Sequence, residues 1–400
     1  MITHEVEVLV AGLGPVGSVG ALNLARQGVQ VAAIEATTNG ATDLRASTFH
    51  APTIEMLDKL GAADVLLEKG LKAPVYQYRD RKSGETFAFD MAEIADRTRF
   101  PFRIQCEQHL MSQDVAAKLA EQSTAKVAYG HRLLFVEQDA DKVTAYVETP
   151  TSVERYVARY LMAADGSNSV TRKVLGLGFP GFTYSEKFLC YSTRYPIEDA
   201  LSGLEYVNYI SDPKEWMVLL RVPNLWRILV PAAEGDDDGM LLSDQNKDEV
   251  FHRMLGDKAQ VETNHRTIYR VHQRVCESFV QGRIGLVGDA AHLNSPMGGF
   301  GMNSGIHDAL NLGDKLVDIL RRGGDPELLA LYDRQRRTVT NSFVQTQTID
   351  NTKAMSEGWA SAREGRRAQM LNLAQDPAAR REYLLRQAMF TSLEDAAAIQ

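Results

Sequence analysis

The pattern of hydrophobic residues at the start of the chain predicts a strand, a helix and a second strand in succession. Val6–Ala11 (VEVLVA) is a short apolar run rich in β-branched residues, which is typical of a buried parallel strand. Ser18–Gln27 is rich in alanine and leucine, and Gly28 follows it as a common helix stop. Val29–Glu35 (VQVAAIE) again has the composition of a strand. This order favours a parallel sheet covered by helices.

The pattern changes twice further along the chain. Apolar runs that end at Asp165-Gly166 and at Gly288-Asp289 predict two more buried strands, the second at Ile284–Val287. Between them, residues 182–233 alternate apolar and polar positions over short runs, which predicts antiparallel strands. The four runs are Lys187–Arg194, Glu205–Ile210, Trp216–Val222 and Trp226–Pro231. The end of the chain predicts helices, broken at Asp376-Pro377, over Pro326–Thr340, Asn341–Glu357 and Ala360–Gln387.

Composition narrows the class of protein. The chain has 400 residues, of which 44% are hydrophobic and 24% charged, and this indicates a globular protein of two or three domains. A net charge of −8 argues against a nucleic-acid partner and against electrostatic binding to a membrane. The three cysteines are far apart and predict neither disulfides nor a metal site. The sequence begins without signal-peptide features and has no bilayer-spanning run, so we expect a cytoplasmic protein.

The turn after the first strand, Gly12-Leu13-Gly14-Pro15-Val16-Gly17, has the dinucleotide-binding pattern GxGxxG. Gly12 permits the tight turn, Gly14 lets the backbone approach a pyrophosphate, and Gly17 lets the helix pack on the sheet. The N-terminus of that helix points free N–H groups at the phosphates. Glu35, followed by Ala36, can accept hydrogen bonds from both ribose hydroxyls. A carboxylate there disfavours a 2′-phosphate, so FAD and NAD remain as ligands.

A later glycine-rich segment, residues 282–311, favours a flavin. Asp289 lies at the carboxyl end of a strand, where it can bond the polyol of a ribityl chain. The Pro296–Gly301 loop lacks bulky side chains at several positions, so its backbone can lie against a flat ring. A helix expected to start near Met302 would aim N–H groups at the N1/O2 edge of the flavin and stabilise the reduced anion.

These two motifs, with the segment YLMAADGSNSVTR (Tyr160–Arg172) between them, resemble the class A FAD-dependent aromatic hydroxylases. This family comprises the p-hydroxybenzoate hydroxylase and phenol hydroxylase-like flavoprotein monooxygenases. The resemblance covers most of residues 5–345. It implies FAD as cofactor, with NADH or NADPH binding transiently near Asp165-Gly166 and Arg45. It also implies hydroxylation of a phenol or other activated aromatic by O2, through C4a-hydroperoxyflavin. Many relatives carry two prolines where this chain has Asn294-Ser295-Pro296.

The resemblance also implies a set of FAD-binding residues. Among them Arg45 would reach the phosphates, and Gln108 would lie near the ribityl or phosphate region, with Gln105 as an alternative. The full set is Gly12, Gly14, Pro15, Val16, Gly17, Glu35, Ala36, Arg45, Gln108, Asp165, Gly166, Asp289, Pro296, Gly299, Gly301, Met302 and Asn303.

Substrate contacts are expected from the antiparallel strands, with Tyr206 and Arg227 as candidates and Pro296 beside the flavin ring. Further candidates on the same strands are Tyr209, Trp216 and Arg221. No residue is assigned as a catalytic acid or base.

Three polar residues near the motifs have competing interpretations. His292 is expected to bond a backbone group and fix its loop rather than to act in catalysis. Arg172 would either clamp a phosphate or hold the Asp165-Gly166 loop. His50 is expected to lie on a solvated loop.

The predicted fold is α/β, or α+β over the whole chain. A discontinuous, Rossmann-like FAD-binding domain would comprise residues 1–71, 105–180 and 280–345. An inserted antiparallel-sheet substrate domain would comprise 72–104 and 181–279, followed by C-terminal helices at 346–400. A monomer and a homodimer are both open.

The motifs do not exclude other activities of enzymes that share this FAD-binding fold. A related FAD enzyme could be an epoxidase, a reductase or a drug-modifying oxygenase. A non-enzymatic flavin-binding module is less favoured, because simple binding does not need a helix N-terminus at the N1/O2 edge.

Overall fold

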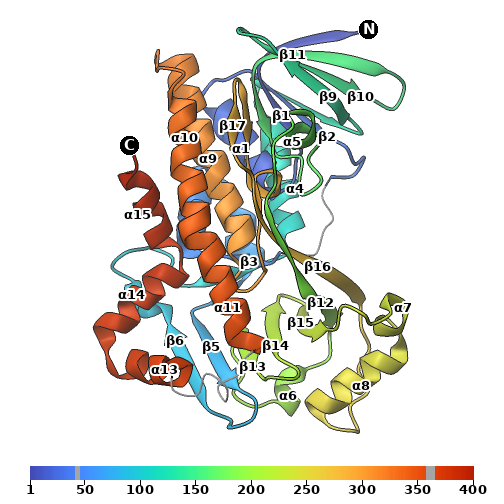
Figure 1. Ribbon diagram of the computed structural model, residues 1–400, viewed down its shortest axis with the longest axis vertical. Helices are drawn as coiled ribbons and strands as arrows, with labels where there is room; N and C mark the ends of the chain where they lie inside the picture. Colours follow the sequence, from blue (N-terminus) through green and yellow to red (C-terminus); the bar gives the residue numbers. More distant parts are fainter. Residues whose placement is uncertain (41–45, 357–364) are drawn as a thin grey trace.

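The computed structural model describes residues 1–40, 46–356 and 365–400. Over these ranges the backbone forms two eight-stranded sheets in opposite halves of the molecule, with helices along one side (Figure 1). None of the helices in these ranges is both long and apolar enough to cross a membrane.

The first sheet has a parallel core of five strands, extended by antiparallel strands. Its members are β1 (Thr3–Ala11), β2 (Val31–Glu35), β8 (Ala125–Tyr129), β9 (Arg132–Gln138), β10 (Val143–Glu148), β11 (Val153–Ala163), β17 (Val280–Gln281) and β18 (Ile284–Leu286). The core runs in the order β18-β11-β1-β2-β8. The last four residues of the central strand β1 are buried, which explains the unbroken apolar run in its sequence.

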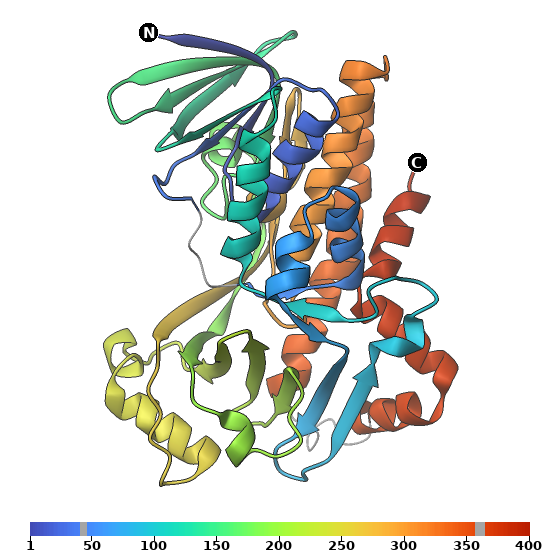
Figure 2. The same ribbon diagram turned by 180° about the vertical axis from the view of Figure 1, so that it is seen from behind.

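Helices pack against this core, and the long ones pack against one another (Figure 2). They include α1 (Pro15–Arg26), α2 (Ala51–Lys59), α3 (Asp64–Lys69), α4 (Gln108–Ala120), α5 (Val170–Val174), α9 (Phe300–Arg321) and α10 (Leu328–Val339). The helix α1 begins three residues earlier than expected because Pro15 occupies its first turn, where the missing N–H costs nothing. A Cβ on Gly20 would lie 2.5 Å from Met162 Sδ and 3.2 Å from Ala309 Cβ, so glycine lets α1 pack closely between the sheet and α9.

The second sheet is antiparallel except where β13 pairs with β5. Its strands are β5 (Val75–Asp80), β6 (Thr86–Asp90), β12 (Gly181–Thr193), β13 (Val207–Ser211), β14 (Met217–Val222), β15 (Leu225–Ala232), β16 (His265–Val275) and β19 (His292–Leu293), in the order β19-β16-β12-β15-β14-β13-β5-β6. The four predicted antiparallel strands correspond to β12–β15, while β16 was not predicted. The long strands β12 and β16 run from one half of the molecule to the other (Figure 1).

Shorter elements complete the antiparallel half and join it to the first sheet. A small sheet contains β3 (Thr48–Phe49), β4 (Leu71–Ala73) and β7 (Arg103–Gln105). Single turns and short helices are η1 (Met91–Ile94), α6 (Ile197–Ala200), α7 (Asp238–Leu241), α8 (Asp244–Leu255) and η2 (Gly288–Ala290).

The C-terminal region is helical, as predicted. A π-helical segment, η3 (Thr340–Gln345), joins α10 to α11 (Thr346–Ser356), and α13 (Gly365–Gln375), α14 (Pro377–Gln387) and α15 (Phe390–Ala398) follow. The predicted break is confirmed, because the Asp376 carboxylate accepts hydrogen bonds from the N–H groups of Ala378 and Ala379. A parallel Rossmann-like sheet, a separate antiparallel sheet and C-terminal helices together make the fold class that the sequence predicted.

Candidate functional site

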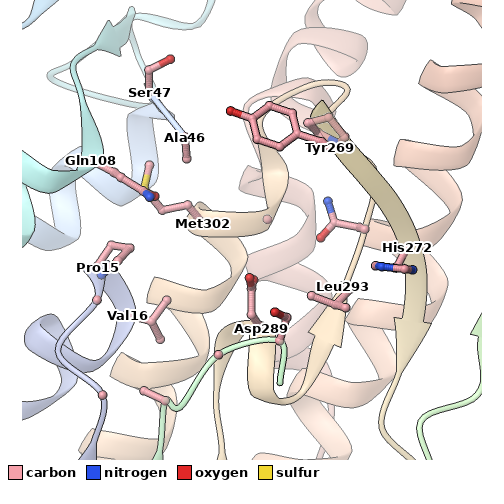
Figure 3. A pocket seen from close by; sticks show the side chains of 18 of the residues that line it. Pro15, Val16, Ala46, Ser47, Gln108, Tyr269, His272, Asp289, Leu293 and Met302 are labelled. Atoms are coloured by element: carbon pink, nitrogen blue, oxygen red, sulfur yellow. The ribbon is translucent and has the colours of Figure 1, made fainter. Parts of the chain in front are cut away.

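A cavity of about 1100 Å³ extends from the carboxyl ends of β1 and β2 to the face of the antiparallel sheet. Figure 3 shows Pro15 and Val16 of α1 on one side, His272 of β16 on the other, and Asp289 between them. The cavity exceeds the usual size of small-molecule sites, about 300–1,000 Å³. It therefore has room for a dinucleotide together with a small ring.

The glycine turn before α1 forms one end of the cavity. Gly12 has φ +98°, and a Cβ there would lie 2.3 Å from Ala164 O, so only glycine fits. A Cβ on Gly17 would lie 1.9 Å from Gly12 O, which makes Gly17 a packing residue that does not line the cavity. A Cβ on Gly14 would meet no described atom within 4 Å. The space in front of Gly14 at the N-terminus of α1 therefore fits an anionic ligand that needs close backbone approach.

Glu35 lies at the end of β2 and lines the same end of the cavity with Ala36. One carboxylate oxygen accepts hydrogen bonds from Thr37 N and Thr37 Oγ1, each at 2.9 Å. The other accepts from Leu13 N at 2.9 Å. These bonds fix the carboxylate beside the glycine turn, and the oxygen that accepts from Leu13 keeps capacity for a further donor such as a ribose hydroxyl.

The Asp165-Gly166 loop also borders the cavity. Asp165 accepts hydrogen bonds from Ser169 Oγ at 2.6 Å and from Thr171 N at 2.9 Å, so its carboxylate stabilises the start of α5. Arg172 Nη1 donates to Ala290 O at 2.8 Å, and its Nη2 donates to Ser167 O at 2.7 Å. Of the two interpretations of Arg172, the loop-holding one fits these contacts.

Asp289 and the loop after it form the middle of the cavity. Asp289, Pro296, Gly299, Gly301 and Met302 all line it (Figure 3 labels Asp289 and Met302). Gly299, with φ +73°, is the N-cap of α9, so that helix begins at Phe300 rather than near Met302. The N-termini of α1 and α9 thus reach one cavity, and both favour negative charge on its occupant.

Asn303 and His50 support this loop from outside the cavity. Asn303 Oδ1 accepts from His50 N at 2.9 Å, and its Nδ2 donates to Gly299 O at 2.7 Å. His50 Nε2 donates to Gly298 O at 2.9 Å, and its ring stacks on Phe300. The expectation of a solvated His50 was wrong, because the ring is fully buried under the loop. Burial lowers the pKa of His50 well below its usual value, so the ring is neutral.

The two glutamine alternatives differ in position. Gln108, at the start of α4, lines the cavity. Gln105 is buried in β7, where its Oε1 accepts from Thr48 Oγ1 at 3.0 Å, and it does not line the cavity. Arg45, the predicted phosphate contact, lies outside the described residues.

Side chains of the antiparallel sheet form the other wall of the cavity. The residues that this sheet contributes are Cys190, Tyr209, Val218, Leu220, Arg227, Leu229, Ile268, Tyr269, Arg270, Val271, His272 and Leu293. Most of them are apolar or aromatic, so this wall suits a ring-shaped ligand. Burial raises the pKa of Cys190 to about 11, and the thiol is therefore protonated at neutral pH.

Arg227 is the charged residue buried most deeply in this wall, with a side chain only 2% exposed. Its Nη2 donates to Glu107 Oε1 at 3.0 Å, which links β15 to the residue before α4. Its Nε and Nη1 atoms are buried and have no hydrogen-bond partner among the described residues. Buried guanidinium donors need acceptors, so these two atoms point to an acceptor on a ligand.

Tyr206 does not reach the cavity. It is 42% exposed and precedes β13, whereas Tyr209 of β13 lines the cavity. Trp216 is buried elsewhere, and Arg221 lies over the ring of Trp226 rather than in the cavity. The sequence reasoning missed Tyr269 and His272 because it missed β16. The run TIYRVHQRV, with β-branched and aromatic residues at alternate positions, was the available signal.

The chain is similar to several characterised proteins. A family model described as the FAD binding domain matches residues 5–347. The chain is 31% identical to para-nitrophenol 4-monooxygenase of Pseudomonas sp. (strain WBC-3) over 94% of both chains. It is 26% identical to pentachlorophenol 4-monooxygenase of Sphingobium chlorophenolicum, over 88% of this chain and 65% of that enzyme. The crystal structure of p-nitrophenol 4-monooxygenase PnpA from Pseudomonas putida DLL-E4 matches with a TM-score of 0.91 and 29% identity, over 99% of both chains.

Proposed function

Since this chain belongs to the FAD-binding class A flavoprotein monooxygenases, a family of aromatic hydroxylases, we propose that it uses NADH or NADPH and O2 to hydroxylate a substituted phenol. One observation carries the proposal. One cavity joins the glycine turn and Glu35 to two buried donors of Arg227 that have no partner in the described parts of the chain. Such a cavity can hold a dinucleotide cofactor at one end and an anionic aromatic ring at the other.

FAD fits the residues at the first end. Gly14 leaves open space at the N-terminus of α1 for the pyrophosphate, and Glu35 would accept bonds from the adenosine ribose. Asp289 would bond the ribityl chain, and the N-terminus of α9 would face the pyrimidine edge. The FAD-binding domain would comprise residues 1–71, 105–180 and 280–345, with the antiparallel strands as a separate substrate domain.

FAD supplies the hydride-accepting and oxygen-activating chemistry when it is bound. The chain would orient the two ligands, exclude water from the aromatic ring and place a positive charge beside it. Arg227 would donate hydrogen bonds from Nε and Nη1 to a phenolate oxygen or to an acceptor atom of a ring substituent. The apolar positions Val218, Leu220 and Leu229 would exclude water from the ring. Pro296 would stand between the two ligands.

The relatives suggest the substrate class. Two of them are named as 4-monooxygenases of phenols that carry nitro or chloro substituents. We infer that this chain accepts a phenol with an electron-withdrawing substituent, since that substituent favours the phenolate that Arg227 would hold.

The test is NADH and NADPH oxidation by the purified, FAD-loaded protein with a panel of nitro-, chloro- and carboxyphenols, measuring H2O2 and oxygenated product. We expect oxidation that a subset of phenols stimulates, with product equal to the donor consumed. Stimulated oxidation that yields only H2O2 with every phenol would contradict hydroxylation. It would favour a related FAD oxidoreductase such as an epoxidase or a reductase.

A further inference from the structure

A cluster of three charged or polar side chains lies behind the cavity, on the far side of the loop that carries Asp289. Asp308 of α9, Arg336 of α10 and His292 of β19 are 0%, 1% and 1% exposed, and none of them lines the cavity. An aspartate and an arginine are rarely buried so completely unless they are paired. The cluster is therefore a specific arrangement that the surrounding structure maintains.

The Asp308 carboxylate is the centre of the cluster. One oxygen accepts from Arg336 Nε at 2.7 Å. The other accepts from His292 Nε2 at 2.8 Å and from the backbone N–H of Gly288 at 3.2 Å. Burial by itself raises the pKa of the Asp308 carboxyl, but the charge of Arg336 and the bond from His292 outweigh burial and hold that pKa below its usual value. Asp308 is thus ionised, with donors on both oxygens.

The contacts of Asp308 are made to residues on both sides of Asp289, which lines the cavity. Gly288 precedes Asp289, and His292 follows it by three positions, so one carboxylate ties down both sides of the turn. The helix α10 adds a second contact to this region, because Tyr332 Oη, one turn before Arg336, donates to Leu286 O at 2.6 Å. His292 does fix its loop, as expected, but through a carboxylate rather than a backbone group.

Gly288 has φ +59° and is packed tightly, since a Cβ there would lie 3.0 Å from Val16 Cγ2. The turn is therefore held in a left-handed conformation between α1 and the Asp308 carboxylate. Loss of the carboxylate would leave the Gly288 N–H without its acceptor, and loss of Arg336 would leave Asp308 as an uncompensated buried charge. Either change would shift the backbone of the turn and so alter the position of Asp289.

We propose that Arg336 is a positioning residue for the cofactor: it fixes Asp308, which fixes the Gly288–His292 turn and so sets how firmly Asp289 holds FAD. This inference rests on the proposed FAD site. Neither charged partner lines the cavity, so the effect is transmitted through the turn rather than by direct contact.

The experiment measures the dissociation constant of FAD, by fluorescence titration of apo-protein, for Arg336→Met, Arg336→Lys, Asp308→Asn and the double variant Arg336→Met/Asp308→Asn. Urea unfolding of each apo-protein is measured in parallel. We expect each neutralising single substitution to weaken FAD binding at least about tenfold in protein that is still folded. The double variant should bind FAD more tightly than the two single effects multiplied together predict, because no charge is left unpaired. Arg336→Lys should retain part of the affinity.

Arg337→Met is the matched control. Arg337 is the next residue of α10, but its partner is Asp333 on the same helix and its side chain is 38% exposed. FAD affinity should stay within about twofold of the original in this variant. If the Arg336 and Asp308 variants bind FAD normally and lose only stability, the cluster is structural and the inference is overturned. If the unaltered protein itself does not bind FAD, the proposed function fails instead.

Discussion

The two walls of the cavity are built in different ways. The wall proposed to hold FAD consists of glycines, helix N-termini and backbone groups, with Gly12 and Gly299 in left-handed conformations and Gly14 facing open space. The opposite wall consists of side chains on antiparallel strands, among them Tyr209, Arg227 and Tyr269. In the first wall the backbone would contact the pyrophosphate and the edge of the flavin, and Glu35 and Asp289 would add side-chain contacts, so the glycine positions are constrained by residue size and by φ. In the second wall, each contact depends on which residue of a strand faces inward.

This difference has a consequence for variation between related proteins. A side chain on the antiparallel wall can change without altering the backbone, whereas Gly12 cannot gain a Cβ without meeting Ala164 O at 2.3 Å. The cofactor wall should therefore tolerate few substitutions, and the substrate wall should set specificity. The following changes test this contrast, in order of decreasing expected effect.

Gly14→Val should abolish useful FAD binding, with a loss of at least about 100-fold in affinity, because the new side chain fills the space that the pyrophosphate needs. Folding should be little affected. Gly14 has φ −64° and ψ −175°, which any residue adopts, so apo-protein stability should change by about 1 kcal/mol or less. FAD titration and urea unfolding measure the two effects separately. The companion Gly12→Ala should instead impair folding itself, and a Gly14→Val protein that binds FAD normally would refute the assignment of this wall.

Arg227→Met should raise the KM of the best phenol by roughly 50-fold, since hydrogen bonds to a charged group are lost from a buried site. FAD affinity should remain within about twofold, because the side chain lies on the other wall. Steady-state kinetics and FAD titration check both statements. Arg221→Met is the control, as Arg221 lies over Trp226 outside the cavity and should leave KM unchanged. An equal increase of KM in both variants would mean that Arg227 only stabilises the sheet.

Acid sensitivity should come from the cofactor side. Burial lowers the pKa of His307 to about 3 and that of His50 well below its ordinary value. Both are neutral when folded, while in the unfolded chain they take up protons near pH 6.5, so the free energy of unfolding should fall as pH decreases from 7.5 to 5. Each residue should contribute about 2 kcal/mol over that range.

Urea unfolding at several pH values measures this slope. His307→Gln, which can still bond Thr53, should remove the contribution of one residue. His265→Gln, on an exposed position of β16, serves as the control. An unchanged slope in His307→Gln would show that the acid sensitivity comes from other groups.

The smallest effect concerns Cys190, a thiol of the substrate wall. Because burial raises its pKa to about 11, its alkylation by iodoacetamide should be slow at pH 7 and should accelerate about tenfold per pH unit up to pH 9. A bound phenol should slow that reaction, while alkylation of Cys276, which does not line the cavity, should not respond. Peptide mass spectrometry gives both rates. If no phenol slows the alkylation of Cys190, the aromatic ring of the substrate binds away from this wall.

The sequence predicted most of the parallel half because its signals are local. The strand-turn-helix-strand order of β1, α1 and β2 lies within the first 35 residues, and each glycine has its own steric reason. Element ends were less predictable: α1 begins at Pro15 and α9 at Phe300, where a proline and a left-handed glycine decide the first turn.

The antiparallel wall could be predicted only in outline, because its details depend on long-range pairing. Tyr206 and Tyr209 lie three residues apart, yet one is exposed and the other lines the cavity. The pairing of β13 with β14 and β5 decides this, and no local pattern contains it. The same holds for His50, whose burial depends on a loop that follows about 250 residues later.

The strand order of the parallel sheet also determines how long a strand waits for its partners while the chain is being synthesised. Val8 of β1 pairs with Tyr160 of β11, and Leu161 of β11 pairs with Ile284 of β18, so β1 and β11 each receive one neighbour late. Asp289 follows Gly14 by 275 positions, which a ribosome takes roughly 14–55 s to translate at about 5–20 residues per second. During that interval first β1, until β11 is made, and then β11, until β18 is made, has an unpaired apolar edge, which is an opportunity for aggregation. The proposed FAD site would therefore be complete only after Asp289 has been synthesised, near the end of that interval.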